Sequence, residues 1–196
     1  KDFGFTQLTG IELPGEVRGR LMKEEKLNNI EFATLLFGQG ITCNLLKLSF
    51  AYQAIANGGI LNKPFIVHKV INKNRVTYQG KTLKIRRVVD EGIARRTTAI
   101  LCSVVEDGSG VGAKIDGMKI AGKTGTAQKV VDGKYSDSAI ITTFIGYFPA
   151  EEPEYLIALL VDEPKKGMWA GNIVAPLFKK VAQSICQATN LHYAIK

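Results

Sequence analysis

The sequence has few of the residues that metal centres and disulfide frameworks require. It contains two histidines and three cysteines among 196 residues, and it has no CxxC pair. His68 and His192 are isolated, and Cys43, Cys102 and Cys186 lie far apart along the chain. Zinc sites need several such ligands at short spacing, so we expect no metal site, no disulfide framework and no cofactor. Cys102 and Cys186 occupy apolar positions of predicted helices, which is typical of buried thiols rather than reactive ones.

Long apolar runs are also missing. The longest, Ala139–Phe148, is interrupted by Thr142, Thr143 and Gly146, whereas a membrane-spanning helix needs about 20 apolar residues. The sequence opens at Lys1 without a methionine or a signal peptide. We therefore expect a piece of a longer protein, whose export signal or anchor would lie upstream.

Acidic residues are fewer than basic ones, which gives a net charge of +8. The basic doublets are spread along the chain and no stacking aromatic residues flank them: Arg86-Arg87, Arg95-Arg96, Lys165-Lys166 and Lys179-Lys180. A nucleic-acid groove needs clustered cations together with aromatic residues. We interpret the doublets as solvated faces with some attraction to anionic surfaces, and we expect no nucleic-acid partner.

Hydrophobic periodicity and turn residues predict one α+β domain over residues 1–196. Helices are predicted over Leu45–Ala56 after the N-cap Asn44, from the N-cap Asp90 to Val105, and over Ile173–Ala188. Alternating and apolar segments predict strands at residues 64–71, 75–78, 82–89, 118–131, 139–148 and 154–161. Residues 31–37 fit a short strand or a helical turn. Strands joined by tight turns, with helices between them, favour an antiparallel sheet packed with helices.

The segment Gly117–Thr126 satisfies two motifs that imply different chemistry. One is GxxxxGK[ST], the phosphate-binding P-loop, which requires a helix to begin at the Lys-Thr pair. Here the four intervening residues predict a strand, and Gly125 and an Asp132-Gly133 turn follow. The context disfavours phosphate binding, and nucleotide binding stays the weaker alternative.

The other motif is Lys123-Thr124-Gly125, one of three signatures of serine β-lactamases and penicillin-binding proteins. Five blocks of sequence in the same order resemble class B penicillin-binding proteins from end to end. They are Phe3–Glu16, Gly38–Gly59, Val104–Ala113, Ala121–Gln128 and Asp162–Phe178. Two departures are Asn44-Leu45, where the family usually has Thr-Pro, and Ala170-Gly171 in place of a Gly-Gly step.

The resemblance implies the serine β-lactamase and penicillin-binding-protein transpeptidase fold, of which this chain would be the C-terminal part. It implies a peptidoglycan D,D-transpeptidase that crosslinks stem peptides ending in D-Ala-D-Ala through a serine acyl-enzyme, which β-lactams trap. Lys123 would supply positive charge and a hydrogen bond, and the Thr126 N–H one half of the oxyanion hole. Thr124, Gly125 and Thr126 would bind substrate. Gly122 and Gly125 would allow close approach of ligand and neighbouring backbone.

The same resemblance implies a location in the bacterial cell envelope, at the outer face of the cytoplasmic membrane. The protein would be held there by an N-terminal anchor outside this chain. Other cell-wall synthesis proteins and the missing part of the same domain are further expected partners. None of the six serines begins Ser-x-x-Lys or Ser-x-Asn, the family's other two signatures. We therefore expect the nucleophile to lie upstream, and the 196 residues alone to be inactive. A non-catalytic module that kept the fold is the remaining alternative.

Overall fold

The computed structural model describes residues 2–21, 28–36, 38, 40–132, 134–165, 169–189 and 191. Several residues used above lie outside these ranges: Phe37, Gln39, Gly133, Lys166 and His192. In the described part of the chain, no helix is both long enough and apolar enough to span a membrane.

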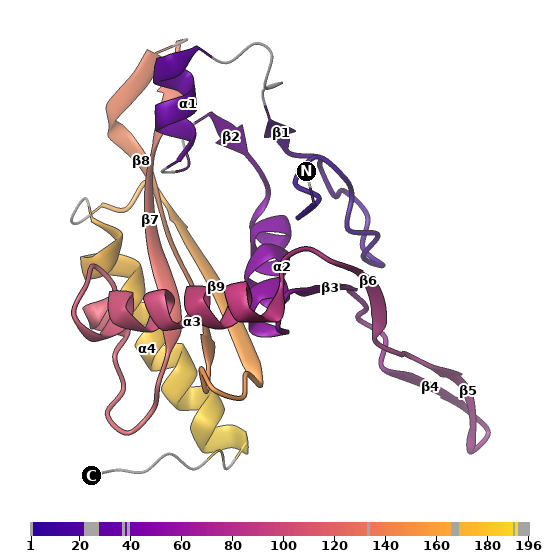
Figure 1. Cartoon of the computed structure of the whole chain (residues 1–196). Coiled ribbons are helices and arrows are strands. Elements are labelled where there is room, and N and C mark those ends of the chain that lie inside the picture. Colours follow the sequence, from indigo (N-terminus) through magenta and orange to yellow (C-terminus); the bar gives the residue numbers. More distant parts are fainter. Residues whose placement is uncertain are drawn as a thin grey trace.

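A three-stranded antiparallel sheet forms the centre of the molecule (Figure 1). Its strands are β7 (Ala121–Val131), β8 (Lys134–Phe148) and β9 (Tyr155–Asp162), in the order β7-β8-β9. Consecutive strands pair because each is joined to the next by a short connection. Among the described residues β7 pairs with β8 alone, so one edge of β7 is open.

The two faces of this sheet bury separate clusters, because neighbouring residues of a strand point to opposite faces. On one face Phe144 packs against Phe178 of α4 (Ala170–Thr189), with ring centroids 4.7 Å apart. On the other face Ala121 and Tyr147 pack with Leu101 of α3 (Glu91–Glu106) and with residues of α2 (Leu45–Ala56). Helices thus cover both faces, which confirms the predicted α+β class.

The remaining elements form smaller units beside the sheet. They are β1 (Arg20–Leu21), α1 (Asn29–Leu35), β2 (Ile41–Thr42), β3 (Ile60–Lys63), β4 (Lys69–Asn72), β5 (Arg75–Gln79), β6 (Leu83–Arg87) and the 3-10 turn Val111–Ala113. β3 pairs with β6, and β4 with β5, each antiparallel. The β4–β5 hairpin extends away from the sheet and helices (Figure 1).

The sequence predicts the helices better than the strand boundaries. Asn44 caps α2 through a 2.7 Å hydrogen bond from the Lys47 N–H, as predicted. Asp90 occupies the N-cap position of α3, but its side chain makes no capping hydrogen bond. Residues 31–37, which fit a strand or a helical turn, belong to α1 as far as Leu35. A capping box between Asn28 and Glu31 begins that helix.

Three strand predictions are wrong in their bounds. The predicted strand 139–148 begins five residues earlier, at Lys134. Of the predicted strand 64–71, only the part from Lys69 onward is a strand, and the strand before it, β3, ends at Lys63. Pro64 has no N–H to donate to a ladder, so pairing stops there. The predicted strand 118–131 begins at Ala121. Met118 instead donates its N–H to the Ile115 carbonyl over 3.1 Å, which closes a turn.

Candidate active site

The Lys123-Thr124-Gly125 triplet lies in the first half of β7, on the open edge of the sheet. Alternation places Thr124 and Thr126 on the face that α4 covers, and Lys123 and Gly125 on the other face. The Thr124 carbonyl accepts a 3.1 Å hydrogen bond from Lys123 Nζ. We infer that this carbonyl faces the open edge, and that the backbone of Thr126, two residues further, faces the same way.

A serine from a neighbouring loop completes a chain of hydrogen bonds at this edge. Ser109 Oγ lies 2.7 Å from Thr124 Oγ1, and Lys123 Nζ donates to the same Thr124 oxygen over 3.3 Å. Both Ser109 and Lys123 are solvent-exposed. The Thr124 hydroxyl is therefore held from two sides, by a cation and by a second hydroxyl.

The loop that carries Ser109 is packed against the first turn of α4. A Cβ on Gly171 would come within 2.5 Å of the Ser109 carbonyl oxygen, and a Cβ on Gly112 within 2.8 Å of the Gly171 carbonyl oxygen. Only glycine allows these backbones to approach so closely. The Gly-Ser-Gly loop and the Ala170-Gly171 step therefore allow the same backbone contact, between this loop and α4.

Thr126 connects the strand to the start of the same helix. The Ala170 N–H donates to Thr126 Oγ1 over 3.3 Å. This N–H is one of the first groups of α4, which have no partner inside the helix and carry partial positive charge. Because Thr126 Oγ1 accepts from Ala170, its own proton stays available to a ligand.

The two glycines of the strand are required by side chains of β8. A Cβ on Gly125 would lie 2.5 Å from Thr143 Oγ1, and a Cβ on Gly122 would lie 2.6 Å from the Phe144 ring. The close approach that the sequence predicts at these positions is made mainly by side chains of β8. At Gly122 a backbone atom also takes part, because the Cβ would lie 3.1 Å from the Ile145 carbonyl oxygen.

The charge of Lys123 is not neutralised within the described part of the chain. The nearby lysines have carboxylate partners: Lys129 binds Glu163 and Asp162 at 2.7 and 3.0 Å, and Lys119 binds Glu151 at 2.9 Å. No such pair involves Lys123 among the described residues. The open edge thus combines an unpaired cation, three hydroxyl groups and a helix N-terminus, which suits a carboxylate ligand.

The cysteines do not offer a substitute nucleophile. Burial raises the pKa of the Cys102 and Cys186 thiols above the ordinary value. The thiolate is the nucleophilic form, so a raised pKa makes both residues less reactive. The prediction that these thiols are buried is confirmed for Cys186, whereas Cys102 is only half-buried.

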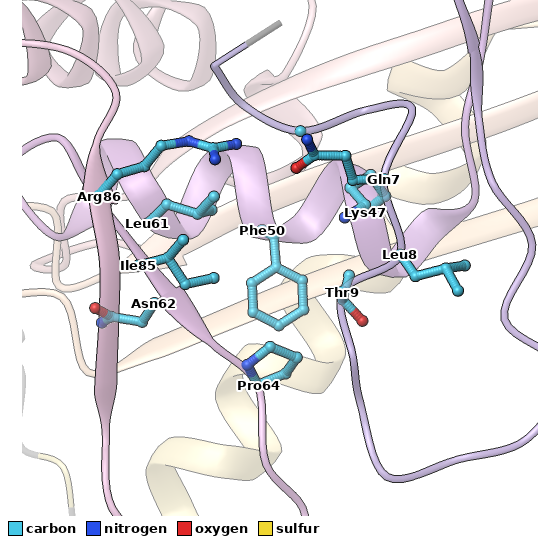
Figure 2. Close-up of a pocket in the computed structure, with 11 residues that line it drawn as sticks. Gln7, Leu8, Thr9, Lys47, Phe50, Leu61, Asn62, Pro64, Ile85 and Arg86 are labelled. Carbon is cyan, nitrogen blue, oxygen red and sulfur yellow. The ribbon is translucent and has the colours of Figure 1, made fainter.

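A separate small cavity of about 40 Å³ lies between the N-terminal segment, α2 and the β3–β6 pair (Figure 2). Its lining includes Lys47, of which only 5% is exposed. Burial lowers the pKa of Lys47, partly opposed by the charge of Glu16. None of the residues of the β7 edge lines this cavity.

Residues 1–183 match the family model for the penicillin binding protein transpeptidase domain. This chain belongs to that family. Stage V sporulation protein D of Bacillus subtilis is 40% identical over 181 residues, which cover 90% of this chain and 28% of that protein. A probable peptidoglycan D,D-transpeptidase PenA of Neisseria meningitidis is 38% identical over 170 residues, which cover 86% of this chain and 28% of that protein.

Solved transpeptidases share the fold as well as the sequence. Penicillin binding protein 3 of Mycobacterium tuberculosis, in complex with aztreonam, matches 99% of this chain with a TM-score of 0.87 and 33% identity. The corresponding transpeptidase domain from Burkholderia pseudomallei matches all of it with a TM-score of 0.85 and 29% identity. The chain covers 46% and 57% of these two structures. It spans about 28% of the curated relatives named above.

The structure does not support the P-loop alternative. Gly117 lies in a turn at a φ of 78°, and Lys123 and Thr124 lie inside β7. No helix begins at the Lys-Thr pair, as a phosphate-binding loop requires. Sequence reasoning also missed two contributors to the site, Ser109 and the N–H of Ala170. The Gly-Ser-Gly loop carried a signal for Ser109, because glycines on both sides of a hydroxyl indicate a close approach.

Proposed function

We propose that this chain is the C-terminal part of a single transpeptidase domain, and that it forms half of the acyl-transfer site of a peptidoglycan D,D-transpeptidase. The other half, with the serine nucleophile, comes from an upstream segment. The observation that carries the proposal is the convergence of Lys123, Thr124, Thr126 and the start of α4 at the open edge of β7. The names of the PenA relatives support the same reaction.

In this reaction the serine oxygen attacks the carbonyl carbon of the penultimate D-Ala of a stem peptide. The C–N bond to the terminal D-Ala then breaks, and that D-Ala leaves with a proton on its amine. An amine of a second stem peptide attacks the resulting ester. A new amide forms, and the serine oxygen regains its proton.

The terminal carboxylate of the donor peptide is the group that the β7 edge fits. Thr124 and Thr126 offer hydroxyl protons, and Lys123 offers an unpaired ammonium. Charge-assisted hydrogen bonds of this kind are about twice as strong as neutral ones. The edge would therefore hold the terminal carboxylate of the donor beside the amide bond that breaks.

The oxyanion of the tetrahedral intermediate is assigned to the backbone N–H of Thr126. By strand alternation this N–H points to the same side as the Thr124 carbonyl, which accepts from Lys123 Nζ and which we infer to face the open edge. A donor fixed in a strand needs no reorganisation as negative charge develops. An extended stem peptide can also pair along the open edge as an additional strand.

β-Lactams are proposed to bind where the D-Ala-D-Ala end binds, since their carboxylate would meet the same donors. The Mycobacterium tuberculosis protein in complex with aztreonam has the same fold, which supports this assignment. We place the whole protein in the bacterial cell envelope, at the outer face of the cytoplasmic membrane and held by an N-terminal anchor. Other cell-wall synthesis proteins are its proposed partners.

The reaction is tested with the full-length protein and a peptide that ends in D-Ala-D-Ala. Released D-Ala is measured for the wild type, for Lys123→Ala and for the control Lys119→Ala. We expect release with the wild type and the control, and a loss of at least about 100-fold with Lys123→Ala. Release that is equal in all three proteins, or absent from the wild type, would reject the proposed role.

A further inference from the structure

The positive charge of the chain is concentrated in one segment. Eight of the 26 basic residues lie in Lys63–Arg87, and this segment contains no acidic residue. The rest of the chain holds 18 basic and 18 acidic residues, so it is balanced. The whole net charge of +8 therefore belongs to this segment, which includes β4, β5 and β6 and is called the basic arm below.

The structure presents the cations of the basic arm to solvent. All are exposed except the half-buried Arg86: Lys63, Lys69, Lys73, Arg75, Lys81, Lys84 and Arg87. Among the described residues, none of the eight forms an ion pair. One carboxylate touches the arm at its base, where Glu12 Oε2 accepts from the N–H groups of Ile66 and Val67 at 3.1 and 3.2 Å.

Apolar side chains are exposed beside these cations. Ile71 and Val76 are a cross-strand pair, and 59% and 52% of their surfaces are exposed. They flank the turn at Lys73 and Asn74, which forms the far end of the β4–β5 hairpin (Figure 1). Val70 and Tyr78, the next paired residues, are each 43% exposed.

We propose that the basic arm docks on an anionic lipid surface. Ile71 and Val76 enter the headgroup region at the tip, and the surrounding cations pair with lipid phosphates. Each cation near such a surface adds to the attraction, and exposed apolar side chains add burial. The projection of the hairpin, visible in Figure 1, lets the tip reach a flat surface without contact from the central sheet.

A lipid surface fits the arm better than an acidic protein does. The cations lie at the end of β3, on β4, β5 and β6, and on their connections, and five of the eight are lysines. A lysine is a compact, hydrated charge on a flexible stem, which suits attraction to a diffuse layer of charge. The small cavity beside α2 is lined at the base of the arm by Pro64, Ile85 and Arg86, and no residue of β4 or β5 lines it.

This docking is a property separate from acyl transfer, since no residue of the β7 edge takes part. It is tested with the 196-residue chain by flotation with vesicles in a density gradient, in which protein that has bound no lipid does not float. One set contains equimolar phosphatidylglycerol and phosphatidylcholine, and the other contains phosphatidylcholine alone. We expect binding to the anionic vesicles, little to the neutral ones, and release at high salt because the cations are exposed.

Two matched variants locate the contact. The arm variant carries Lys69→Gln, Lys73→Gln, Arg75→Gln and Lys81→Gln. The control carries Arg96→Gln, Lys134→Gln, Lys165→Gln and Lys180→Gln, which are exposed residues outside the arm. Both lose four charges. We expect the arm variant to bind at least about tenfold more weakly and the control to change less than about twofold.

The apolar part is tested by Ile71→Thr with Val76→Thr, which keeps β-branched residues in the strands. We expect at least about threefold weaker vesicle binding. Circular dichroism verifies the fold of every variant. Equal losses in the arm and control variants would overturn the proposal, as would equal binding to neutral vesicles. Binding to poly-glutamate without binding to anionic vesicles would also overturn it, in favour of an acidic protein partner.

Discussion

Ser109 Oγ lies 2.7 Å from Thr124 Oγ1, although the two residues come from different elements. Ser109 belongs to the loop after α3, and Thr124 lies in β7. The loop is fixed by its packing against Gly171 of α4. We therefore predict that Ser109 is a positioning residue, which sets the direction of the hydroxyl that is proposed to bind the substrate carboxylate.

Replacement of this serine separates positioning from folding. In the full-length protein, Ser109→Ala removes one hydrogen bond to Thr124, and we expect the acylation rate by penicillin to fall about three- to tenfold. Ser109→Thr keeps a hydroxyl and is expected to recover most of that rate. The second-order acylation rate constant is the measurement. An alanine variant that acylates like the wild type would contradict the positioning role.

Thr126 is expected to support stability as well as binding, because its hydroxyl accepts from the first N–H of α4. Thr126→Val leaves the Ala170 N–H without this partner and should cost about 1 kcal/mol of unfolding free energy. For a chain of this size the thermal midpoint would fall by about 2–4 °C. Thr126→Ser, which keeps the hydroxyl, is the control. Equal midpoints for the valine and serine variants would show that the hydrogen bond contributes nothing.

Gly122 tests the packing of the active strand against β8. A Cβ there would lie 2.6 Å from the ring of Phe144, which is fully buried. Gly122→Ala is expected to lower the unfolding free energy by about 1–3 kcal/mol, measured by urea denaturation. Gly92→Ala is the control, since a Cβ at that position meets no atom within 4 Å. A smaller loss for Gly122 than for Gly92 would contradict the packing described above.

The isolated chain is expected to associate. Ile93 and Ile100 of α3 are 41% and 66% exposed, and in the described residues β9 pairs with β8 alone. An apolar helix face and an open strand edge are surfaces that another segment normally covers. Light scattering should report dimers or larger species for residues 1–196 and a monomer for the complete domain. A clean monomer of the 196-residue chain would count against the missing-segment interpretation.

The sequence predicts the parts of this fold that depend on local chemistry. Asn44 as an N-cap, the three long helices and the central strands follow from side-chain type and periodicity. The start of β7 does not, because Met118 is apolar and strand-like but takes part in a turn with Ile115. The local pattern of apolar residues cannot show which of them has a neighbouring strand to pair with.

Some residues of the candidate site could likewise be predicted from the sequence and others could not. The Lys123-Thr124-Gly125 triplet and its place on a strand were visible in the sequence, because the family signature is contiguous. The Ala170 N–H was not, since it reaches the site through a contact between distant residues, and Ser109 had only the indirect signal of the glycines on both sides of it. The exposure of Ile93 and Ile100 likewise depends on what packs against α3.

We propose that this chain supplies the carboxylate-binding and oxyanion half of a serine acyl-transfer site. This role is tested by covalent labelling with a fluorescent penicillin, followed on a denaturing gel. The full-length protein should be labelled, the Lys123→Ala variant should be labelled at least about 100-fold more slowly, and the 196-residue chain should take up no label. Covalent label on the isolated chain, or undiminished labelling of the Lys123→Ala variant, would show that the proposed role is wrong.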